Sequence, residues 1–403
     1  MLRLVFAAAL ATGAIATPAI AQTFRADGPQ AGLYGQNNGY PTCRAYHFEL
    51  ECRVGAFSNF SSLFPSRTIR TSATPSVLKR APQELRLTYQ GDGTNGTLDD
   101  YLNHRPTTGL LIARGDTILA ERYQYGRTDR QLMTSFSMAK SIVGLLIGIA
   151  VEERFIRSID DTAETYVPEL KGSEYGRTPI KALLLMASGV IFTEQYNNPS
   201  SDIFTLSRLT LQQDPAGSLE AVKRFNNRRA APGNLFSYAS SESLVLGLVL
   251  AHATGRTVAD YASEKLWQPL GAEADDNWIV DSKGQEITYA FYNARLRDWA
   301  RLGLMLAHGG KWNGRQIVPE SWVTASTVPQ PDWTWRGYGY QFWMSPGGGG
   351  QYYLSGLRGQ FFWIDPATKT VLAQTSVNSD EPAGRELGAL FYAATRWAGL
   401  RGE

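Results

Sequence analysis

The stretch SFSMAKSIVGLLIGIAVEE, residues 135–153, decides how the rest of the chain is interpreted. Its apolar run over residues 142–151 is ten residues long, which is too short for a membrane-spanning helix and predicts a helix buried within protein. A Ser-x-x-Lys motif, formed by Ser137 and Lys140, opens this helix. Residues three apart lie on one helical face, one turn from each other. We therefore expect the Ser137 hydroxyl and the Lys140 amine to meet at the helix N-terminus.

A serine and a lysine placed in this way are a candidate nucleophile and base. Free backbone N–H groups and the positive end of the helix dipole stabilise an oxyanion that develops beside Ser137. Burial lowers the pKa of a lysine, and the neutral amine can accept the serine proton. The structural alternative is a capping serine and a lysine that extends to solvent. A second copy, Ser76 and Lys79, follows a proline in a polar stretch with no buried helix after it, so its context does not favour catalysis.

A tyrosine that precedes a second buried helix is the candidate partner of this pair. The Tyr-x-Asn/Ser pattern occurs several times, but only Tyr238 and Ser240 lead into an apolar helix, which we expect over residues 240–255. A phenol beside a lysine ammonium favours its phenolate and can pass a proton to a leaving group. A packed core tyrosine is the alternative for Tyr238 taken alone.

Composition excludes several function classes. The chain has 403 residues, with 39 Lys and Arg against 37 Asp and Glu, and this near-balance argues against a nucleic-acid surface. None of the four histidines has a metal-binding spacing, and two cysteines cannot form an all-cysteine zinc site. No Walker A loop and no Gly-x-Gly-x-x-Gly motif after a predicted strand appears, and the Gly-x-Ser-x-Gly nucleophile elbow is absent. We therefore expect no metal, no organic cofactor and no nucleic-acid partner.

The first residues indicate export. Arg3 provides a positive n-region, residues 4–16 are apolar, and Ala-Ile-Ala at 19–21 is a small-x-small cleavage site. Residues 1–21 thus predict a signal peptide, and a mature chain that is periplasmic or secreted and keeps no stable membrane anchor. The alternative, an uncleaved anchor, is disfavoured because the apolar run is shorter than a spanning helix.

Two further regions follow the signal peptide. Residues 22–104 are rich in Gly, Asn, Ser and Pro and predict an irregular leader, in which Cys43 and Cys52 either form a local disulfide or remain free thiols. Residues 105–403 form the predicted domain, with strands near both ends and a helical block at roughly 155–290. This order predicts an α/β (α+β) fold, with an antiparallel sheet built from both chain ends, flanked by helices, and an all-helical subdomain.

Four segments together resemble the serine β-lactamase and penicillin-binding-protein superfamily. They are SFSMAKSI, ASGVIFTEQYNNPSSDI, FSYASSESLVLG and SGLRGQFFWIDP, and they span residues 135–366. Their pattern is most similar to the class C-like branch of esterases and amidases, and within it to the 6-aminohexanoate-dimer (nylon oligomer) hydrolases. The resemblance extends over about residues 105–400. It implies a site in the cleft between the sheet and the helical subdomain.

The resemblance also assigns roles to individual residues. It implies Ser137 as nucleophile, Lys140 as base and Tyr238 as proton shuttle. The oxyanion hole would consist of the backbone N–H groups of Ser137 and Leu357. The positions that it places around the substrate are Tyr196, Ser240, Gly356 and Arg358.

The chain departs from true β-lactamases at the third motif. They carry Lys or His where this chain has Leu354, and a leucine cannot pair with a substrate carboxylate. Arg358 could partly substitute for that cation. Ser240 replaces the usual asparagine. These features predict an exported serine hydrolase that cleaves small amides or esters through an acyl-enzyme without a cofactor. The alternatives are a β-lactamase or D-Ala-D-Ala carboxypeptidase, and a non-catalytic scaffold. The substrate and the oligomeric state are not specified by the sequence.

Overall fold

The structure is a computed structural model, and it describes residues 23–43, 49–91, 93–329, 337–379 and 383–397. The segment expected to be a signal peptide, residues 1–21, lies outside the described residues.

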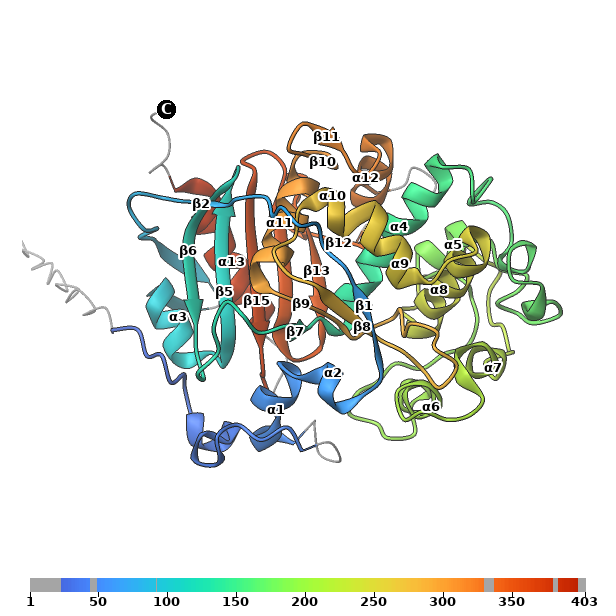
Figure 1. The fold of residues 1–403 in the computed structure, drawn as a ribbon, viewed down its shortest axis with the longest axis horizontal. Coiled ribbons are helices and arrows are strands. Elements are labelled where there is room, and N and C mark those ends of the chain that lie inside the picture. The colour runs from blue at the N-terminus through green and yellow to red at the C-terminus, as the bar shows by residue number, and fades with distance from the viewer. Residues whose placement is uncertain (1–22, 44–48, 92, 330–336, 380–382, 398–403) are drawn as a thin grey trace, which may run out of the picture.

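The largest sheet has seven strands and joins the two ends of the domain (Figure 1). Its centre is formed by two antiparallel partners from opposite ends of the domain, β15 and β5. The expected sheet built from both chain ends is therefore confirmed. One edge differs from expectation, because β2 comes from the leader and pairs parallel with β6. In spatial order the strands are β12 (Trp343–Met344), β13 (Tyr352–Gly356), β14 (Gln360–Asp365), β15 (Thr370–Ser376), β5 (Thr107–Arg114), β6 (Thr117–Tyr123) and β2 (Lys79–Arg80).

Side-chain alternation along β5 shows how the sheet is covered on both faces. Leu110 and Ile112 join one apolar cluster and Leu111 joins another, as the two-residue period of a strand requires. The first cluster lies under α3 (Leu98–His104) and α13 (Ala383–Arg396), and the second lies under α11 (Leu296–Ala307). The sheet is thus the middle layer of a three-layer domain (Figure 1).

The expected helical block packs against the side of the sheet (Figure 1). Two buried helices, α4 just before the block and α8 within it, contact each other and begin at the two sequence motifs. Gly255 ends α8 in the left-handed conformation (φ 65°), which glycine adopts without strain. The helices of the block are α5 (Ile180–Leu184), α6 (Asp202–Thr210), α7 (Gly217–Lys223), α8 (Ser240–Thr254), α9 (Val258–Ala262) and α10 (Gln268–Leu270). Two helices from outside these bounds are α4 (Ala139–Glu152) and α12 (Glu320–Thr327), which contact each other.

A second, four-stranded sheet combines a strand of the leader, β1, with strands from later in the chain. It contains β8, which falls inside the stretch that we expected to be entirely helical. Short strands of this kind carry little periodic signal, and their partners are distant in sequence. In spatial order its strands are β1 (Ser66–Ile69), β8 (Asp276–Ile279), β9 (Tyr292–Ala294) and β7 (Met133–Thr134); two small hairpins are β3 (Thr88–Gly91) with β4 (Thr94–Thr97), and β10 (Lys311–Trp312) with β11 (Arg315–Gln316).

The segment expected to be an irregular leader contains regular elements that belong to the domain. Besides β1 to β4 and α3, it holds α1 (Leu50–Phe57) and α2 (Phe60–Leu63). Cys43 and Cys52 form a disulfide with their Cα atoms 5.7 Å apart, so the structure has the bridge rather than two free thiols. This part of the chain is held to the domain by strand pairing and buried side chains.

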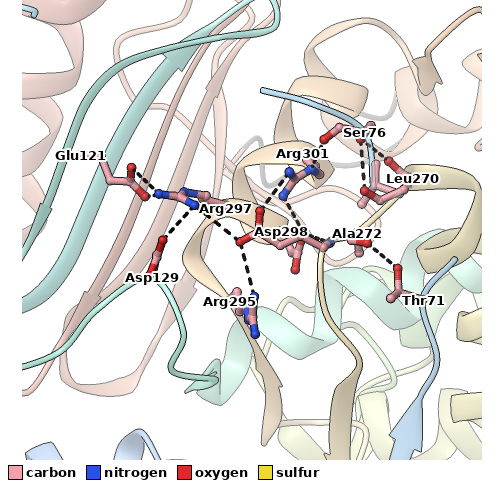
Figure 2. Close-up of polar contacts among 12 residues, drawn as sticks. Thr71, Ser76, Glu121, Asp129, Leu270, Ala272, Arg295, Arg297, Asp298 and Arg301 are labelled. Atoms are coloured by element: carbon pink, nitrogen blue, oxygen red, sulfur yellow. Dashed lines mark hydrogen bonds and ion pairs between the residues drawn. The ribbon is translucent and has the colours of Figure 1, made fainter. Parts of the chain in front are cut away.

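Ser76 of the second Ser-x-x-Lys copy is part of that attachment (Figure 2). The buried Ser76 hydroxyl donates to the carbonyl oxygen of Leu270 at 2.8 Å, and its own carbonyl accepts from Arg301 Nε at 2.9 Å. Arg301 also pairs with Asp298 at 2.8 Å, and burial raises the pKa of that carboxyl to about 6 although Arg301 opposes the rise. Lys79 lies at the sheet edge, 2.9 Å from Asp116. Both residues of this copy therefore have structural contacts.

Candidate active site

The turn before α4 holds Ser137 in place. Phe136, Ser137 and Met138 form one short 3-10 helix, η4, before α4 begins. Phe136 has a φ of 43°, a left-handed conformation that costs free energy for a residue with a side chain. Surrounding contacts hold this conformation: Ser135 exchanges hydrogen bonds with Tyr292 of β9, at 2.8 and 3.1 Å, and the Phe136 ring packs on Phe57 at 4.9 Å. The strain lies at the residue adjacent to the predicted nucleophile.

The Lys140 amine has three oxygen neighbours. Its Nζ lies 3.1 Å from Ser137 Oγ, 3.0 Å from Ser240 Oγ and 2.8 Å from the carbonyl oxygen of Tyr289. A neutral amine has two N–H groups and one lone pair. The carbonyl of Tyr289 can only accept, so it takes one N–H, and the Ser240 oxygen can take the other. The lone pair is then left for the proton of the Ser137 hydroxyl, which is the arrangement a general base requires.

Burial also adjusts the charge of this amine. Lys140 is 1% exposed. Burial lowers the pKa of Lys140 to about 8, while the carboxylate of Glu194 acts in the opposite direction. A substantial neutral fraction therefore exists near neutral to mildly alkaline pH. A lowered pKa of Lys140 is what we expected from its position in an apolar helix.

Tyr238 contacts the same amine through its ring. The Lys140 Nζ lies 5.1 Å from the ring centroid, within the range of a cation–π contact. The ring is half-buried and stacks on Trp343 at 5.5 Å. Such a contact stabilises the ammonium that forms when the amine takes a proton. The structure thus brings together the three residues that we predicted, Ser137, Lys140 and Tyr238.

An acidic residue that the sequence reasoning missed joins the two predicted substrate-side residues. The carboxylate of Glu194 accepts from the Ser240 backbone N–H at 2.6 Å, from the Ser240 hydroxyl at 2.9 Å and from the Tyr196 hydroxyl at 2.6 Å. Tyr196 is 41% exposed and lines the cavity beside Ser137. The signal was present, since Glu194 lies two residues before Tyr196 in the same family-like segment. We had singled out only the tyrosine.

The end of β13 approaches the Ser137 turn at the position that we predicted. A Cβ atom added to Gly356 would lie 2.4 Å from the carbonyl oxygen of Ser135, so only glycine permits this contact. Leu357 follows at the start of the 3-10 segment η8 (Leu357–Gly359) and lines the same cavity as Ser137. In the described part of the chain, neither the Ser137 nor the Leu357 N–H donates a backbone hydrogen bond to another loop.

The remaining third-motif residues have different surroundings. Leu354 belongs to the buried core and is 1% exposed, so this position presents no cation to a substrate. Arg358 lines the cavity, but its Nη1 donates to the carbonyl oxygen of Ser379 at 2.5 Å. Its backbone is left-handed, with a φ of 65°.

The cavity beside Ser137 is small and mainly apolar. Its volume is about 190 Å³. The apolar walls are formed by Phe136, Ile203, Phe204, Phe291 and Leu357.

Two other kinds of site are not found in the described part of the chain. Among the described residues, no cluster of three His, Cys, Asp or Glu side chains could hold a metal ion. Within the same described ranges, no helix is long and apolar enough to cross a membrane.

A hydroxyl next to a buried, partly neutral lysine, at a small open cavity, defines the site of a serine hydrolase. Comparison with known proteins identifies the family. Residues 95–395 match the family described as Beta-lactamase, and the chain belongs to it. It is a β-lactamase-family serine hydrolase related to 6-aminohexanoate-dimer hydrolases.

Individual relatives agree with this assignment. The chain is 28% identical over 380 residues to a 6-aminohexanoate-dimer hydrolase of Paenarthrobacter ureafaciens, which covers 87% of this chain and 92% of that protein. A Bacillus anthracis protein assigned as a 6-aminohexanoate-dimer hydrolase has a similar structure, with a TM-score of 0.77, 24% identity and coverage of 89% and 95%. A family VIII carboxylesterase shares the fold, with a TM-score of 0.55, 16% identity and coverage of 72% and 92%.

Proposed function

We propose that the protein hydrolyses small amides or esters through an acyl-enzyme on Ser137. The observation that carries this proposal is the hydrogen-bonding of Lys140. Two acceptors, Ser240 and Tyr289, occupy its N–H groups and leave its lone pair facing the Ser137 hydroxyl. The amine and the nucleophile are therefore oriented before a substrate binds.

The acylation step follows from these contacts. Lys140 takes the proton of Ser137 as the oxygen bonds to the substrate carbonyl carbon. The carbonyl electron pair moves to its oxygen, which accepts hydrogen bonds from the N–H groups of Ser137 and Leu357. Each donor of this kind contributes roughly 3–4 kcal/mol in comparable sites. The bond to the leaving group then breaks as the proton held by Lys140 reaches the leaving oxygen or nitrogen through the Tyr238 hydroxyl.

In deacylation, water is the nucleophile, Lys140 is again the base, and Ser137 is the leaving group. Water attacks the acyl carbon and gives a proton to neutral Lys140. The bond to Ser137 breaks, and its oxygen recovers the proton. No metal or organic cofactor takes part in either step.

The cavity supports a small, apolar acyl group. Its volume of about 190 Å³ and its phenylalanine walls suit a short acyl chain. Leu354 provides no partner for the carboxylate of a β-lactam or a D-Ala-D-Ala peptide. We therefore favour amides and esters over β-lactams.

A fluorophosphonate probe tests the nucleophile. We expect it to label the wild type but not Ser137→Ala, and no labelling of folded wild-type protein would contradict the proposal. p-Nitrophenyl esters, linear amide dimers and nitrocefin then compare the substrate classes. Turnover of nitrocefin faster than of the esters and amides would favour the β-lactamase alternative.

We also propose that residues 1–21 are a signal peptide and that the mature chain is exported and starts at Gln22. The disulfide between Cys43 and Cys52 supports this, because disulfides persist in oxidising compartments. Mass spectrometry of the periplasmic fraction, or of the medium, should find this N-terminus. An intact Met1 on the protein recovered there would contradict cleavage.

A further inference from the structure

Both turns that carry the proposed oxyanion donors contain a strained residue beside the donor. Phe136, with a φ of 43°, directly precedes Ser137, and Arg358, with a φ of 65°, directly follows Leu357. A residue with a side chain keeps a left-handed backbone only where surrounding contacts hold it there. The contacts that hold these two turns therefore also fix the positions of the two N–H groups.

Arg53 of the leader helix α1 reaches the turn that carries Leu357. Although its side chain is a cation, Arg53 is only 7% exposed. Its Nη1 donates to the carbonyl oxygen of Asn378 at 2.9 Å and, more weakly, to that of Val377 at 3.5 Å. The backbone N–H of Asn378 in turn donates to the carbonyl oxygen of Arg358 at 3.2 Å. The guanidinium thus holds the segment to which the strained Arg358 is hydrogen-bonded.

Phe57 of the same helix reaches the turn that carries Ser137. Arg53 and Phe57 are separated by one helical turn, so they lie on one face of α1. The buried Phe57 ring packs edge-to-face on the Phe136 ring, with centroids 4.9 Å apart. One face of α1 therefore supports both turns, at the end of the domain where β7 leads into the Ser137 turn (Figure 1).

The helix α1 is itself closely attached to the segment before it. The disulfide between Cys43 and Cys52 joins that segment to the second turn of the chain's path into α1. A Cβ atom added to Gly55 would lie 2.2 Å from the carbonyl oxygen of Tyr40, so the helix backbone and the segment are in direct contact. These contacts restrict movement of α1 away from the two turns.

We propose that Arg53 is a positioning residue of the oxyanion hole. It does not touch the substrate. By holding the carbonyl oxygens of Val377 and Asn378 it keeps the Arg358 turn, and with it the Leu357 N–H, where the oxyanion accepts its hydrogen bond. This rests on the hydrolase function proposed above and adds to it a dependence of catalysis on the leader. Since negative charge develops on the carbonyl oxygen only in the transition state, Arg53 affects kcat rather than substrate binding.

Steady-state kinetics with a p-nitrophenyl ester test this role. We expect Arg53→Ala to lower kcat roughly 10- to 100-fold and to leave KM within about twofold of the wild type, because a displaced donor still permits substrate binding. Arg53→Lys keeps a charged donor, so its loss of kcat should be smaller. Arg127→Ala is the matched control. Arg127 also joins the end of α1 to the domain, but through Ser58 Oγ at 2.7 Å rather than through either turn, and its kinetic constants should match those of the wild type.

Inhibition by phenylboronic acid separates positioning from a general loss of folded protein. The boron forms a tetrahedral adduct with a serine nucleophile and places an oxygen in the oxyanion hole, and its Ki does not depend on how much of the enzyme is active. The Ki of Arg53→Ala should rise by about the same factor as kcat/KM falls. A loss of kcat with an unchanged Ki, or wild-type kinetics in Arg53→Ala, would overturn the role. Melting temperatures report folding, and if Arg53→Ala does not fold, the same comparison for Arg53→Lys decides.

The wild type distinguishes failure of this role from failure of the proposed function. If it neither hydrolyses the ester nor binds phenylboronic acid, the hydrolase function fails and the role of Arg53 fails with it. If it does both and the Arg53 variants behave identically, only the role of Arg53 fails.

Discussion

Replacing Glu194 by glutamine should shift the pH dependence of catalysis. Activity requires neutral Lys140, so kcat/KM rises with pH through the pKa of that amine, which lies at about 8. The Glu194 carboxylate favours the charged amine and opposes its deprotonation. Removing this charge should lower the pKa of Lys140, and the midpoint of the acidic limb should move to lower pH.

The size of the shift follows from the geometry. Because the Lys140 amine and the nearest Glu194 oxygen both contact the Ser240 hydroxyl, at 3.0 and 2.9 Å, they are at most about 6 Å apart. At this separation two unit charges interact by about 0.7 kcal/mol in bulk water and by about 3 kcal/mol at an effective dielectric constant of 20. Since about 1.36 kcal/mol corresponds to one pKa unit, the shift is about 0.5 to 2 units.

The assay is kcat/KM for a p-nitrophenyl ester from pH 5.5 to about 9.5, with the midpoint as the readout. The glutamine side chain in Glu194→Gln could still accept one hydrogen bond, so a lower plateau alone reports altered positioning of Ser240 rather than a change in charge. Tyr196→Phe is the control, because it removes a hydrogen bond to Glu194 but keeps the carboxylate, and its midpoint should stay in place. A midpoint that is unchanged or higher in Glu194→Gln would refute the reasoning.

Four further outcomes follow from the same structure. Lys140→Met should reduce kcat/KM about 10²- to 10⁴-fold in a folded protein. Because burial lowers the pKa of Lys140 to about 8, the unfolded chain binds more protons above that pH, so the wild type should gain stability over Lys140→Met in urea titrations as pH rises from about 8 to about 10. Gly356→Ala should abolish ester hydrolysis, since its Cβ atom would lie 2.4 Å from the Ser135 carbonyl oxygen; full activity would contradict this contact. Cys43→Ser/Cys52→Ser should lower the unfolding free energy by about 2–3 kcal/mol, measured by denaturant melts, and an unchanged midpoint would show that the loop is held by other contacts.

The local parts of the site were determined by the sequence. Ser137 and Lys140 lie one helical turn apart, and the helical geometry fixes their proximity wherever the helix packs. The apolar character of α4 indicated that the lysine would be buried, and burial lowers its pKa. The hairpin of β5 and β6 was also predictable, because its signals lie within a few residues of one another.

Contacts between distant parts of the chain required the tertiary structure. The position of Tyr238 over Lys140 was an expectation from resemblance, and only the packing of α8 on α4 produces it. The Tyr289 carbonyl had no sequence signal, since a backbone oxygen has no residue identity. Glu194 lies in the family-like segment, but only the structure shows that its carboxylate accepts from Ser240 and Tyr196.

The leader and the aromatic residues of β12, β13 and β14 also depend on contacts between distant parts of the chain. The short strands β1 and β2 are too brief to give a periodic pattern, and they become strands only because β8 and β6 offer free edges to pair with. Trp343, Tyr353 and Trp363 look unrelated along the chain, and the register of β12, β13 and β14 aligns them into one surface. The sequence determines which residues lie close together within one helical turn or hairpin, because the backbone fixes the distance between them. Only strand register and helix packing decide which distant side chains meet.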